Sequence, residues 1–387
     1  MVIEPKVRDF ICTTAHPDGC RENVKRQIEY TKKQPKVNLK KKILIIGAST
    51  GYGLATRIAA TYSLDAATIG IMFERPANSR RTATPGFYNT EAFEKFAKED
   101  GYYAESINGD AFSDEVKAQT IELIKKDLGK VDMVIYSLAA PKRKTSDGTV
   151  YSSALKTTSS DFTNKSLNLK TYEISEATIT PATEEEINST VKVMGGEDWK
   201  DWIKALTDAD VLEKNAITVA YSYIGPKLTY PVYYNGTIGM AKKHLYNTSI
   251  EINDEFKNKG IKAYISVNKA LVTQASSAIP VVPLYIAIMY KVMKEKNIHE
   301  GCIEQMNRLF HQKLSAEIIP VDSEKRIRLD DYEMREDVQS EIMEHWNNVS
   351  SENVNSLADI KGYFDDFYNM FGFHFDNIDY TKDVTLI

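Results

Sequence analysis

Tyrosine and lysine side chains that suit acid–base chemistry gather in one segment, residues 221–243. A tyrosine hydroxyl can give a proton to a substrate oxygen, and a nearby lysine charge lowers the tyrosine pKa toward neutrality. A lysine also presents several hydrogen-bond donors, which suit a ligand rich in hydroxyl groups. The candidates for the acid are Tyr221, Tyr223, Tyr230, Tyr233 and Tyr234, and the candidate cations are Lys242 and Lys243.

An apolar strand followed by a glycine-rich turn lies near the start of the chain, at residues 42–53, KILIIGASTGYG. A short, wholly aliphatic run is typical of a strand that is buried on both faces of a parallel sheet. Gly47, Gly51 and Gly53 allow a tight turn and a close approach of the backbone to a pyrophosphate at a helix N-terminus. The turn therefore predicts a dinucleotide site, and its G-x3-G-x-G spacing is that of short-chain reductases.

An acidic residue ends the second apolar strand, which we expect over residues 67–73. Glu74 lies 21 positions after Gly53, close to the spacing at which an acid binds the adenine-side ribose hydroxyls. A carboxylate there repels a 2′-phosphate, so the pattern predicts NADH in preference to NADPH. The opposing interpretation, a site for that phosphate, rests on Arg75, Arg80 and Arg81.

Strand and helix signals alternate along most of the chain. This alternation predicts an α/β fold, a Rossmann-type doubly wound parallel sheet like that of short-chain reductases. Further strands are expected over residues 103–107, 131–141, 216–223 and 262–267. Helices are expected over residues 90–100, 114–126 and 197–206, and a long one between the last two strands. Trp199 and Trp202, three positions apart, should both face the core.

Six short segments carry a specific resemblance: 47–53, 73–74, 110–111, 138–139, 221–225, and Tyr233 paired with Lys242. Together they resemble the FabV-type enoyl reductases, which include trans-2-enoyl-CoA reductases and enoyl-[acyl-carrier-protein] reductases. Residues 16–20, 192–199 and 271–280 match as well, so the resemblance spans nearly the whole chain. Eight residues separate Tyr233 from Lys242, whereas common short-chain dehydrogenases leave three and the smaller enoyl reductases leave six.

The resemblance implies NADH-dependent reduction of the C2=C3 bond of a trans-2-enoyl thioester, in fatty acid synthesis or butyrate-type fermentation. The substrate is enoyl-CoA or enoyl-acyl-carrier-protein. Tyr233 is then the proton donor, Lys242 contacts NADH, Lys243 is a candidate auxiliary, and Tyr223 contacts the substrate. The implied cofactor contacts are Gly47, Ala48, Ser49, Thr50, Gly51, Tyr52, Phe73, Glu74, Asp110, Ala111, Leu138, Ala139, Lys242, Leu271, Val272 and Thr273.

The Tyr233–Lys242 spacing has a structural consequence of its own. Nine steps at about 100° each leave the two residues on opposite faces of a regular helix, whereas gaps of three and six residues return a pair to one face. Pro231 precedes Tyr233, and Asn235 and Gly236 follow it. We therefore predict that Tyr233 precedes the helix, which begins near Asn235 or Thr237.

We interpret residues 1–387 as a single Rossmann-type reductase domain. Residues 1–140 would form its NADH-binding half and residues 141–318 its catalytic and substrate half. Residues 319–387 would form a C-terminal extension that packs on the body, through an aromatic tail that ends at Tyr380.

Two segments of the second half are expected to have special roles. Residues 142–175 are rich in Lys, Ser and Thr and predict a surface hairpin. Residues 274–290 are polar and then strongly apolar, and we expect them to close over the acyl chain.

Composition excludes several classes of function. A net charge of −5 gives no reason to expect a nucleic-acid partner, because phosphate binding generally needs a basic face. No apolar run approaches a membrane span and the first residues do not resemble a signal peptide, so we expect no membrane partner and a cytoplasmic protein. The three cysteines and six histidines show no metal-ligand spacing, so no metal is expected. No second nucleotide motif lies near the C-terminus, so we do not expect FAD.

Two alternatives to an enoyl reductase remain open from the sequence. One is a short-chain carbonyl reductase that uses the same hydroxyl to protonate an alkoxide, and the other is a catalytically silent nucleotide-binding sensor. We also expect a monomer, because the extra segments would cover the helices that smaller relatives use for tetramer contacts.

Overall fold

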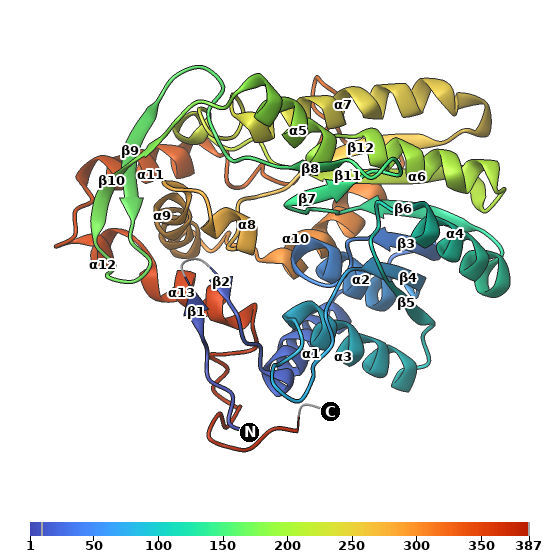
Figure 1. Ribbon diagram of the computed structural model, residues 1–387, viewed down its shortest axis with the longest axis horizontal. Helices are drawn as coiled ribbons and strands as arrows, with labels where there is room; N and C mark the ends of the chain where they lie inside the picture. The colour runs from blue at the N-terminus through green and yellow to red at the C-terminus, as the bar shows by residue number, and fades with distance from the viewer. Residues whose placement is uncertain (9–10, 386–387) are drawn as a thin grey trace.

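Seven parallel strands form the central sheet of the computed structural model, which describes residues 1–8 and 11–385 (Figure 1). Their order is β13-β12-β11-β6-β3-β4-β5. The strands are β3 (Lys42–Ile46), β4 (Ala67–Met72), β5 (Ala104–Asn108), β6 (Val131–Tyr136), β11 (Leu212–Ser222), β12 (Lys262–Val267) and β13 (Ile327–Arg328). The chain builds outward from β3 to β5, crosses back to β6, and builds outward again to β13. This is the predicted doubly wound Rossmann-type sheet.

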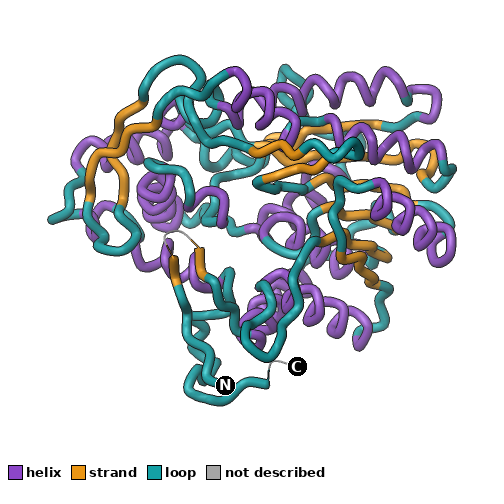
Figure 2. Tube along the Cα trace, in the orientation of Figure 1, coloured by secondary structure: helices purple, strands orange, loops and turns teal. Residues whose placement is uncertain are grey.

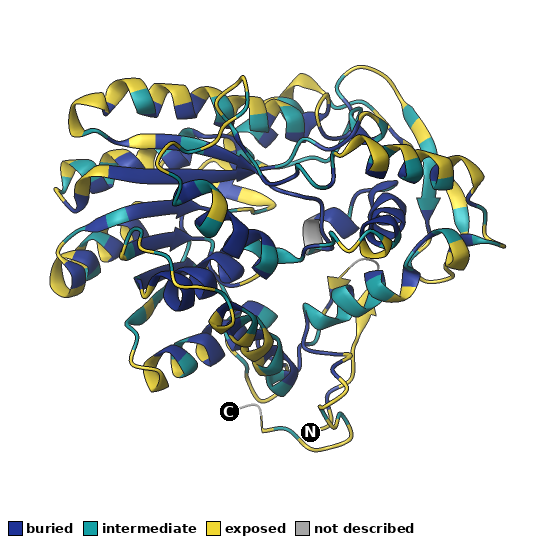
Figure 3. Cartoon of the chain, turned by 180° about the vertical axis from the view of Figure 1, so that it is seen from behind, coloured by how far each residue is buried: buried dark blue, intermediate teal, exposed yellow. Residues whose placement is uncertain are grey.

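The central strand β3 is buried on both faces because its side chains are all aliphatic after Lys42. Ile43 and Ile45 belong to the apolar cluster on one face of the sheet, and Leu44 and Ile46 to the cluster on the other. Alternate side chains of a strand point to opposite faces, so each face receives two of these residues. Figure 3 shows the interior of the sheet as buried.

Helices cover both faces of the sheet. One face is packed by α1 (Pro17–Lys32), α2 (Gly51–Leu64), α3 (Pro85–Glu99) and α10 (Cys302–Arg308), which continues into η4 (Leu309–Leu314). The other is packed by α4 (Asp114–Leu123) with η1 (Ile124–Leu128), α6 (Glu197–Asp208) and α7 (Thr237–Glu255). Trp199 and Trp202 of α6 are fully buried against this second face, as predicted. Helix α3 begins at Pro85, before the predicted 90, because proline suits the first helical position.

Two antiparallel hairpins, where one was expected, follow β6 (Figure 2). The first pairs β7 (Lys142–Lys144) with β8 (Val150–Ser152), and the second pairs β9 (Phe162–Leu167) with β10 (Ile174–Ile179). The helix α5 (Glu184–Met194), which the sequence analysis missed, packs on α7. Its first turn is closed by a capping box between Thr183 and Glu186.

A separate apolar body lies beside the sheet around α9 (Val282–Glu295), whose side chains are almost all buried. Strand β9, α11 (Glu336–Asn348) and α13 (Ile360–Asn369) pack against α9. Tyr363, Phe367, Phe371 and Phe373 are buried in the same cluster. The remaining elements are β1 (Val7–Arg8), β2 (Ile11–Cys12), η2 (Lys227–Thr229), η3 (Lys257–Lys259), α8 (Gln274–Ser277) and α12 (Val354–Leu357). Among the described residues, no helix combines the length and apolar character needed to cross a membrane.

Two glycines of the turn after β3 are constrained for different reasons, which gives a test of the fold. A Cβ on Gly53 would lie 1.8 Å from the Gly47 carbonyl oxygen, so the backbone must move. A Cβ on Gly51 would meet nothing within 4 Å, but its φ is +53°. We expect Gly53→Ala to lower the free energy of unfolding by about 3 kcal/mol or more and Gly51→Ala by about 1–2 kcal/mol. Urea unfolding followed by tryptophan fluorescence measures both, and equal losses would contradict the crowding at Gly53.

Candidate active site

The predicted cofactor residues gather at one edge of the sheet, because the carboxyl ends of parallel strands meet there. Residues 47–52 follow β3, 73–74 follow β4, 110–111 follow β5, 138–139 follow β6, and 271–273 follow β12. Strands β3 and β6 are neighbours, but the chain leaves them toward opposite sides of the sheet. A crevice for a ligand is expected at such a reversal of strand order.

The turn between β3 and α2 has the backbone geometry that a pyrophosphate site needs. Gly47 has a φ of +84°, and a Cβ there would lie 2.7 Å from the Ser137 carbonyl oxygen. Thr50, the residue before α2, makes no side-chain capping hydrogen bond to the helix. The first N–H groups of α2 therefore lack this common partner and suit an anionic ligand. The turn fits the pyrophosphate of a dinucleotide.

Glu74 stands against this turn. Its Oε1 accepts a hydrogen bond of 2.6 Å from the Ser49 hydroxyl, and a Cβ on Gly86 would lie 2.0 Å from the same oxygen. The guanidinium of Arg75 instead donates to the Thr82 carbonyl at 3.4 Å. Arg80 and Arg81 are exposed. The carboxylate, and not a guanidinium, therefore faces the loop that follows β3.

The loop after β5 is anchored from behind by residues to which the sequence analysis gave no role in the site. The Ala111 carbonyl accepts hydrogen bonds from the Lys117 ammonium at 3.2 Å and from the Trp202 indole at 3.1 Å. Lys117 forms a buried ion pair of 2.7 Å with Asp198, and the Tyr136 hydroxyl donates to the other carboxylate oxygen at 3.0 Å. These contacts fix the position of residues 110–111.

The other cofactor candidates differ in exposure. Phe73 and Ala139 are exposed, and Leu138 is half-buried. Leu271 and Val272 are buried, and the Val272 N–H donates to the Tyr290 hydroxyl at 3.2 Å. All of them lie at the same edge of the sheet.

Three of the five candidate tyrosines are engaged elsewhere. The Tyr221 hydroxyl is hydrogen-bonded to the Thr56 hydroxyl at 2.6 Å in the interior. Tyr230 and Tyr234 stack on each other with ring centroids 4.9 Å apart, and Tyr234 is 53% exposed. Tyr223 and Tyr233 remain. The buried Tyr233 ring and the half-buried Tyr223 ring meet edge to face with centroids 4.8 Å apart.

Tyr233 lies in the turn before α7, which begins at Thr237, so its predicted place before the helix is correct. Lys242 lies in the second turn of α7 and is half-buried, and its ammonium donates to the Tyr221 carbonyl at 3.0 Å. Lys243 is exposed. The turn before the helix thus brings Tyr233, Tyr223 and Lys242 to the carboxyl end of β11.

The pKa values of this pair differ from the sequence-based expectation. Burial lowers the pKa of Lys242 to about 8. The pKa of Tyr233 is raised, by burial first and then by the charge of Glu333, and not lowered by a lysine. The correction has a physical reason, since burial disfavours the charged phenolate and the negative charge of Glu333 disfavours it further. Tyr233 therefore keeps its proton at neutral pH.

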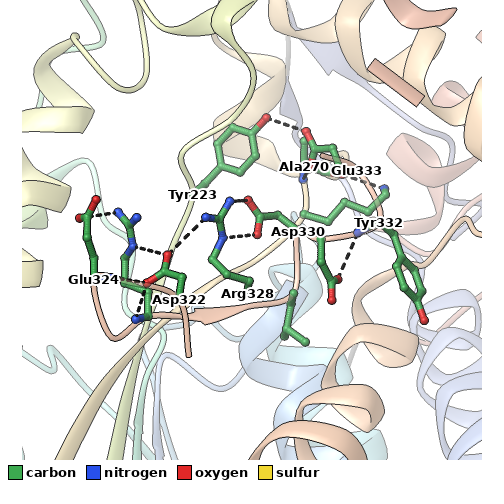
Figure 4. A network of polar contacts seen from close by, with 12 residues as sticks. Tyr223, Ala270, Asp322, Glu324, Arg328, Asp330, Tyr332 and Glu333 are labelled. Carbon is green, nitrogen blue, oxygen red and sulfur yellow. Dashed lines mark hydrogen bonds and ion pairs between the residues drawn. The ribbon is translucent and has the colours of Figure 1, made fainter. Parts of the chain in front are cut away.

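Glu333 is a further residue of the site that the sequence gave no signal for (Figure 4). Its carboxylate is fully buried and accepts from the Tyr223 hydroxyl at 3.0 Å. It also accepts from the Tyr285 hydroxyl at 2.7 Å and from the Ala270 N–H at 2.8 Å. Burial raises its pKa, and the charge of Lys269 acts in the opposite direction.

Salt bridges of Arg328 hold the segment that carries Glu333 in place. Arg328 of β13 binds both carboxylate oxygens of Asp330, at 2.7 and 2.6 Å, and its third nitrogen lies 3.3 Å from Asp322. Such two-pronged contacts are geometrically specific. Tyr52 is held comparably, because its hydroxyl donates to the Lys269 carbonyl and accepts from Gln305, both at 2.6 Å.

Three family models match consecutive parts of the chain. They are described as the NAD(P)H binding domain of trans-2-enoyl-CoA reductase (residues 2–79), the trans-2-enoyl-CoA reductase catalytic region (residues 81–315) and the enoyl reductase FAD binding domain (residues 321–384). The chain belongs to the trans-2-enoyl-CoA reductase family. The family prediction is thereby confirmed.

Named relatives match along nearly their whole length. A trans-2-enoyl-CoA reductase [NADH] of Ruminiclostridium cellulolyticum is 55% identical over 100% of this chain and 98% of its own. An enoyl-[acyl-carrier-protein] reductase [NADH] of Flavobacterium johnsoniae is 56% identical over 99% and 97%. The structure of a Clostridium trans-2-enoyl-CoA reductase in complex with NADH superimposes with a TM-score of 0.97, at 46% identity over 100% and 98% of the two chains.

These matches confirm an NADH-dependent oxidoreductase that reduces enoyl thioesters. They favour it over the short-chain carbonyl reductase and over the silent nucleotide-binding sensor. NADH also fits the residues present, because the glycine turn has the backbone geometry for a pyrophosphate and the Glu74 carboxylate lies against this turn.

The flavin in the description of the third model finds no matching site. Its two glycines are Gly362 and Gly372, and neither lies in a turn between a strand and a helix. A Cβ would lie 2.2 Å from Asp359 at Gly362 and 2.4 Å from the His16 carbonyl at Gly372, so the chain itself fills both spaces. The residues of this region do not fit a bound FAD. Over the described part of the chain, no cluster of His, Cys, Asp and Glu suits a metal ion.

The position of Glu74 predicts the choice of cofactor. NADPH would place a phosphate against this carboxylate, which costs a few kcal/mol, or on the order of 10²-fold in affinity. Glu74→Ser should therefore weaken the use of NADH modestly and improve kcat/KM for NADPH strongly. Glu99→Ser removes the same charge from the far end of α3 and should change neither value. Equal use of NADPH by the wild type would contradict the role of Glu74.

Proposed function

We propose that Tyr233 donates to the thioester oxygen, that Lys242 holds the nicotinamide ribose, and that Tyr223 contacts the substrate. In the reduction C3 receives a hydride, negative charge passes to the thioester oxygen, and C2 receives a proton. NADH supplies the hydride. A donor aimed at that oxygen stabilises the enolate and so lowers the barrier.

The assignment of Tyr233 rests on one observation. Within the described residues its hydroxyl has no hydrogen-bond partner in the protein, whereas the Tyr223 hydroxyl is bonded to Glu333. The raised pKa of Tyr233 supports the same role, because a protonated phenol can donate to an enolate. Tyr233 is therefore the candidate whose proton is available to a substrate.

Lys242 has the reach and the charge for a ribose. Its ammonium group carries three donors, and the Tyr221 carbonyl accepts one of them. The other donors suit the two ribose hydroxyls. The remaining cofactor contacts that we propose are those predicted from the sequence, all of which follow strands at the same edge of the sheet.

We further propose that residues 1–387 work as one domain. The sheet supports this, because its strands come from all three regions that the family models match: β3 and β4 from the first, four strands from the second, and β13 from the third. Residues 274–290, which run from α8 into the apolar helix α9, would cover the acyl chain. Either CoA or acyl-carrier protein serves as the carrier in this proposal.

A monomer in the cytoplasm completes the proposal. Helix α5, from one of the extra segments, packs over α7 and so covers one face of that helix. A cytoplasmic location suits an enzyme that consumes NADH. Light scattering after gel filtration tests the monomer directly, and a dimer or tetramer would contradict it.

Loss of the Tyr233 hydroxyl should separate chemistry from binding. Tyr233→Phe removes only the group that meets the enolate, so we expect kcat with crotonyl-CoA to fall by roughly 10²-fold or more while NADH still binds. The exposed neighbour gives a matched control, and Tyr234→Phe should keep most of the turnover. Near-normal turnover of Tyr233→Phe would transfer the acid role to Tyr223.

Replacement of Lys242 should change both the affinity for NADH and the rate of turnover. Lys242→Met should raise the Kd for NADH and lower kcat, whereas Lys243→Met, one residue along and exposed, should do so far less. Because burial lowers the pKa of Lys242 to about 8, the wild type should lose NADH affinity as the pH rises through this value. The Met variant should lack that dependence, and an unchanged Kd for NADH would contradict the role.

A further inference from the structure

A fully buried carboxylate that the proposed mechanism does not use lies directly behind Tyr223 (Figure 4). Glu333 follows β13, and Tyr223 follows β11, so the tertiary structure joins residues that are 110 positions apart. Oε1 of Glu333 is shared by the hydroxyls of Tyr223 and Tyr285, and Oε2 faces the Ala270 N–H.

Two of these three hydrogen bonds have a fixed direction. The Ala270 N–H can only donate, so Oε2 must accept. The Tyr285 hydroxyl receives a hydrogen bond from the Gln339 side-chain nitrogen at 3.2 Å, so its own proton is directed to Glu333. The direction of the third bond, to Tyr223, therefore depends only on whether Glu333 is ionised.

The hydrogen bonds around Glu333 are those of an ionised carboxylate, because Tyr285 and Ala270 both direct donors at it. Burial is the largest influence on its pKa and raises it, and the charge of the buried Lys269, in the loop after β12, is the largest influence that lowers it. The donors of Tyr285 and Ala270 act in the same direction, while burial and Asp330 oppose them. A carboxylate with three donors leaves no buried acceptor without a partner.

We propose that Glu333 is a positioning residue that acts through Tyr223: its carboxylate takes the single hydroxyl proton of Tyr223 into a hydrogen bond and so leaves Tyr233 to donate to the substrate oxygen. This inference rests on the proposed role of Tyr233. The same carboxylate also holds Ala270, which precedes the proposed cofactor residues 271–273. Glu333 thus ties the substrate side of the site to the cofactor side.

Replacement by glutamine reverses the hydrogen bond to Tyr223 while keeping the shape of the side chain. The Ala270 N–H requires an acceptor, so the amide oxygen of Glu333→Gln must take the place of Oε2. The amide NH2 then faces Tyr223 and Tyr285 and donates to both, so the Tyr285 hydroxyl must turn its own proton away from residue 333. Tyr223 becomes an acceptor on that side, and its own proton is free for the substrate.

The decisive comparison uses the Tyr233→Phe background, with kcat for crotonyl-CoA as the measurement. We expect Tyr233→Phe combined with Glu333→Gln to turn over about 10-fold faster than Tyr233→Phe alone, since one hydrogen bond to the enolate is regained. Adding Tyr223→Phe should abolish the gain. Tyr285→Phe, which removes the other hydroxyl from the same oxygen, should give no gain in the Tyr233→Phe background.

A purely structural role of Glu333 predicts a decrease in kcat in the Tyr233→Phe background, because a second damaging substitution lowers kcat further. Equal or lower turnover of the folded double variant would therefore overturn the inference. The proposed function is tested separately by Tyr233→Phe alone, whose normal turnover would refute the role of Tyr233 before Glu333 is considered.

If Glu333→Gln does not fold, as judged by its melting temperature, the pH dependence of turnover tests the inference instead. Lowering the pH protonates Glu333, whose pKa is raised, and the acid then donates to Tyr223. Residual turnover of Tyr233→Phe should rise as the pH falls, and Tyr233→Phe with Tyr223→Phe should show no rise. The same profile in both variants would overturn the inference. The groups that face Glu333 are Lys269, Tyr285, Tyr223 and Asp330.

Discussion

The parallel pairing of strands around β3 is the constraint on which the site depends. Parallel strands bring all their carboxyl ends to one edge, so loops that are far apart in the chain begin within reach of one ligand. The buried aliphatic side chains of β3 hold this edge from both faces. The chain reverses its direction of growth beside β3, and the glycine turn lies at that reversal.

Buried charged residues fix the positions of loops that the sheet brings to its carboxyl edge. The pair of Lys117 and Asp198 is almost fully enclosed and holds the loop after β5 through the Ala111 carbonyl. Loss of one partner of such a pair leaves an uncompensated buried charge, which costs about 3–5 kcal/mol. Glu333 has a similar place on the substrate side, where its burial is offset by three donors and by Lys269. Precise placement at this edge therefore depends on groups behind it.

The C-terminal segment belongs to the site as well as to the fold. Its first strand, β13, extends the sheet beyond β12, and the residues that follow carry Glu333 to Tyr223. Its later helices pack against α9, the apolar helix beside the substrate residues. The segment expected to be an extension that packs on the body thus also contributes a residue to the candidate active site.

The sequence by itself determined the local features. Glycine spacing indicated the nucleotide turn, and Glu74 was identified by its distance from that turn. The place of Tyr233 before its helix followed from helical periodicity, since two residues nine positions apart lie on opposite faces of a regular helix. These features depend on residues that are near each other in the chain.

Only the tertiary structure placed Glu333 against Tyr223, Lys117 against Asp198, and β13 beside β12. The residues of the first two pairs are 110 and 81 positions apart in the chain. Nothing in the local sequence indicates that such a charge will be buried or which group will lie against it. The pKa of Tyr233 was decided in the same way, because burial and the charge of Glu333, which the local sequence does not encode, raise it.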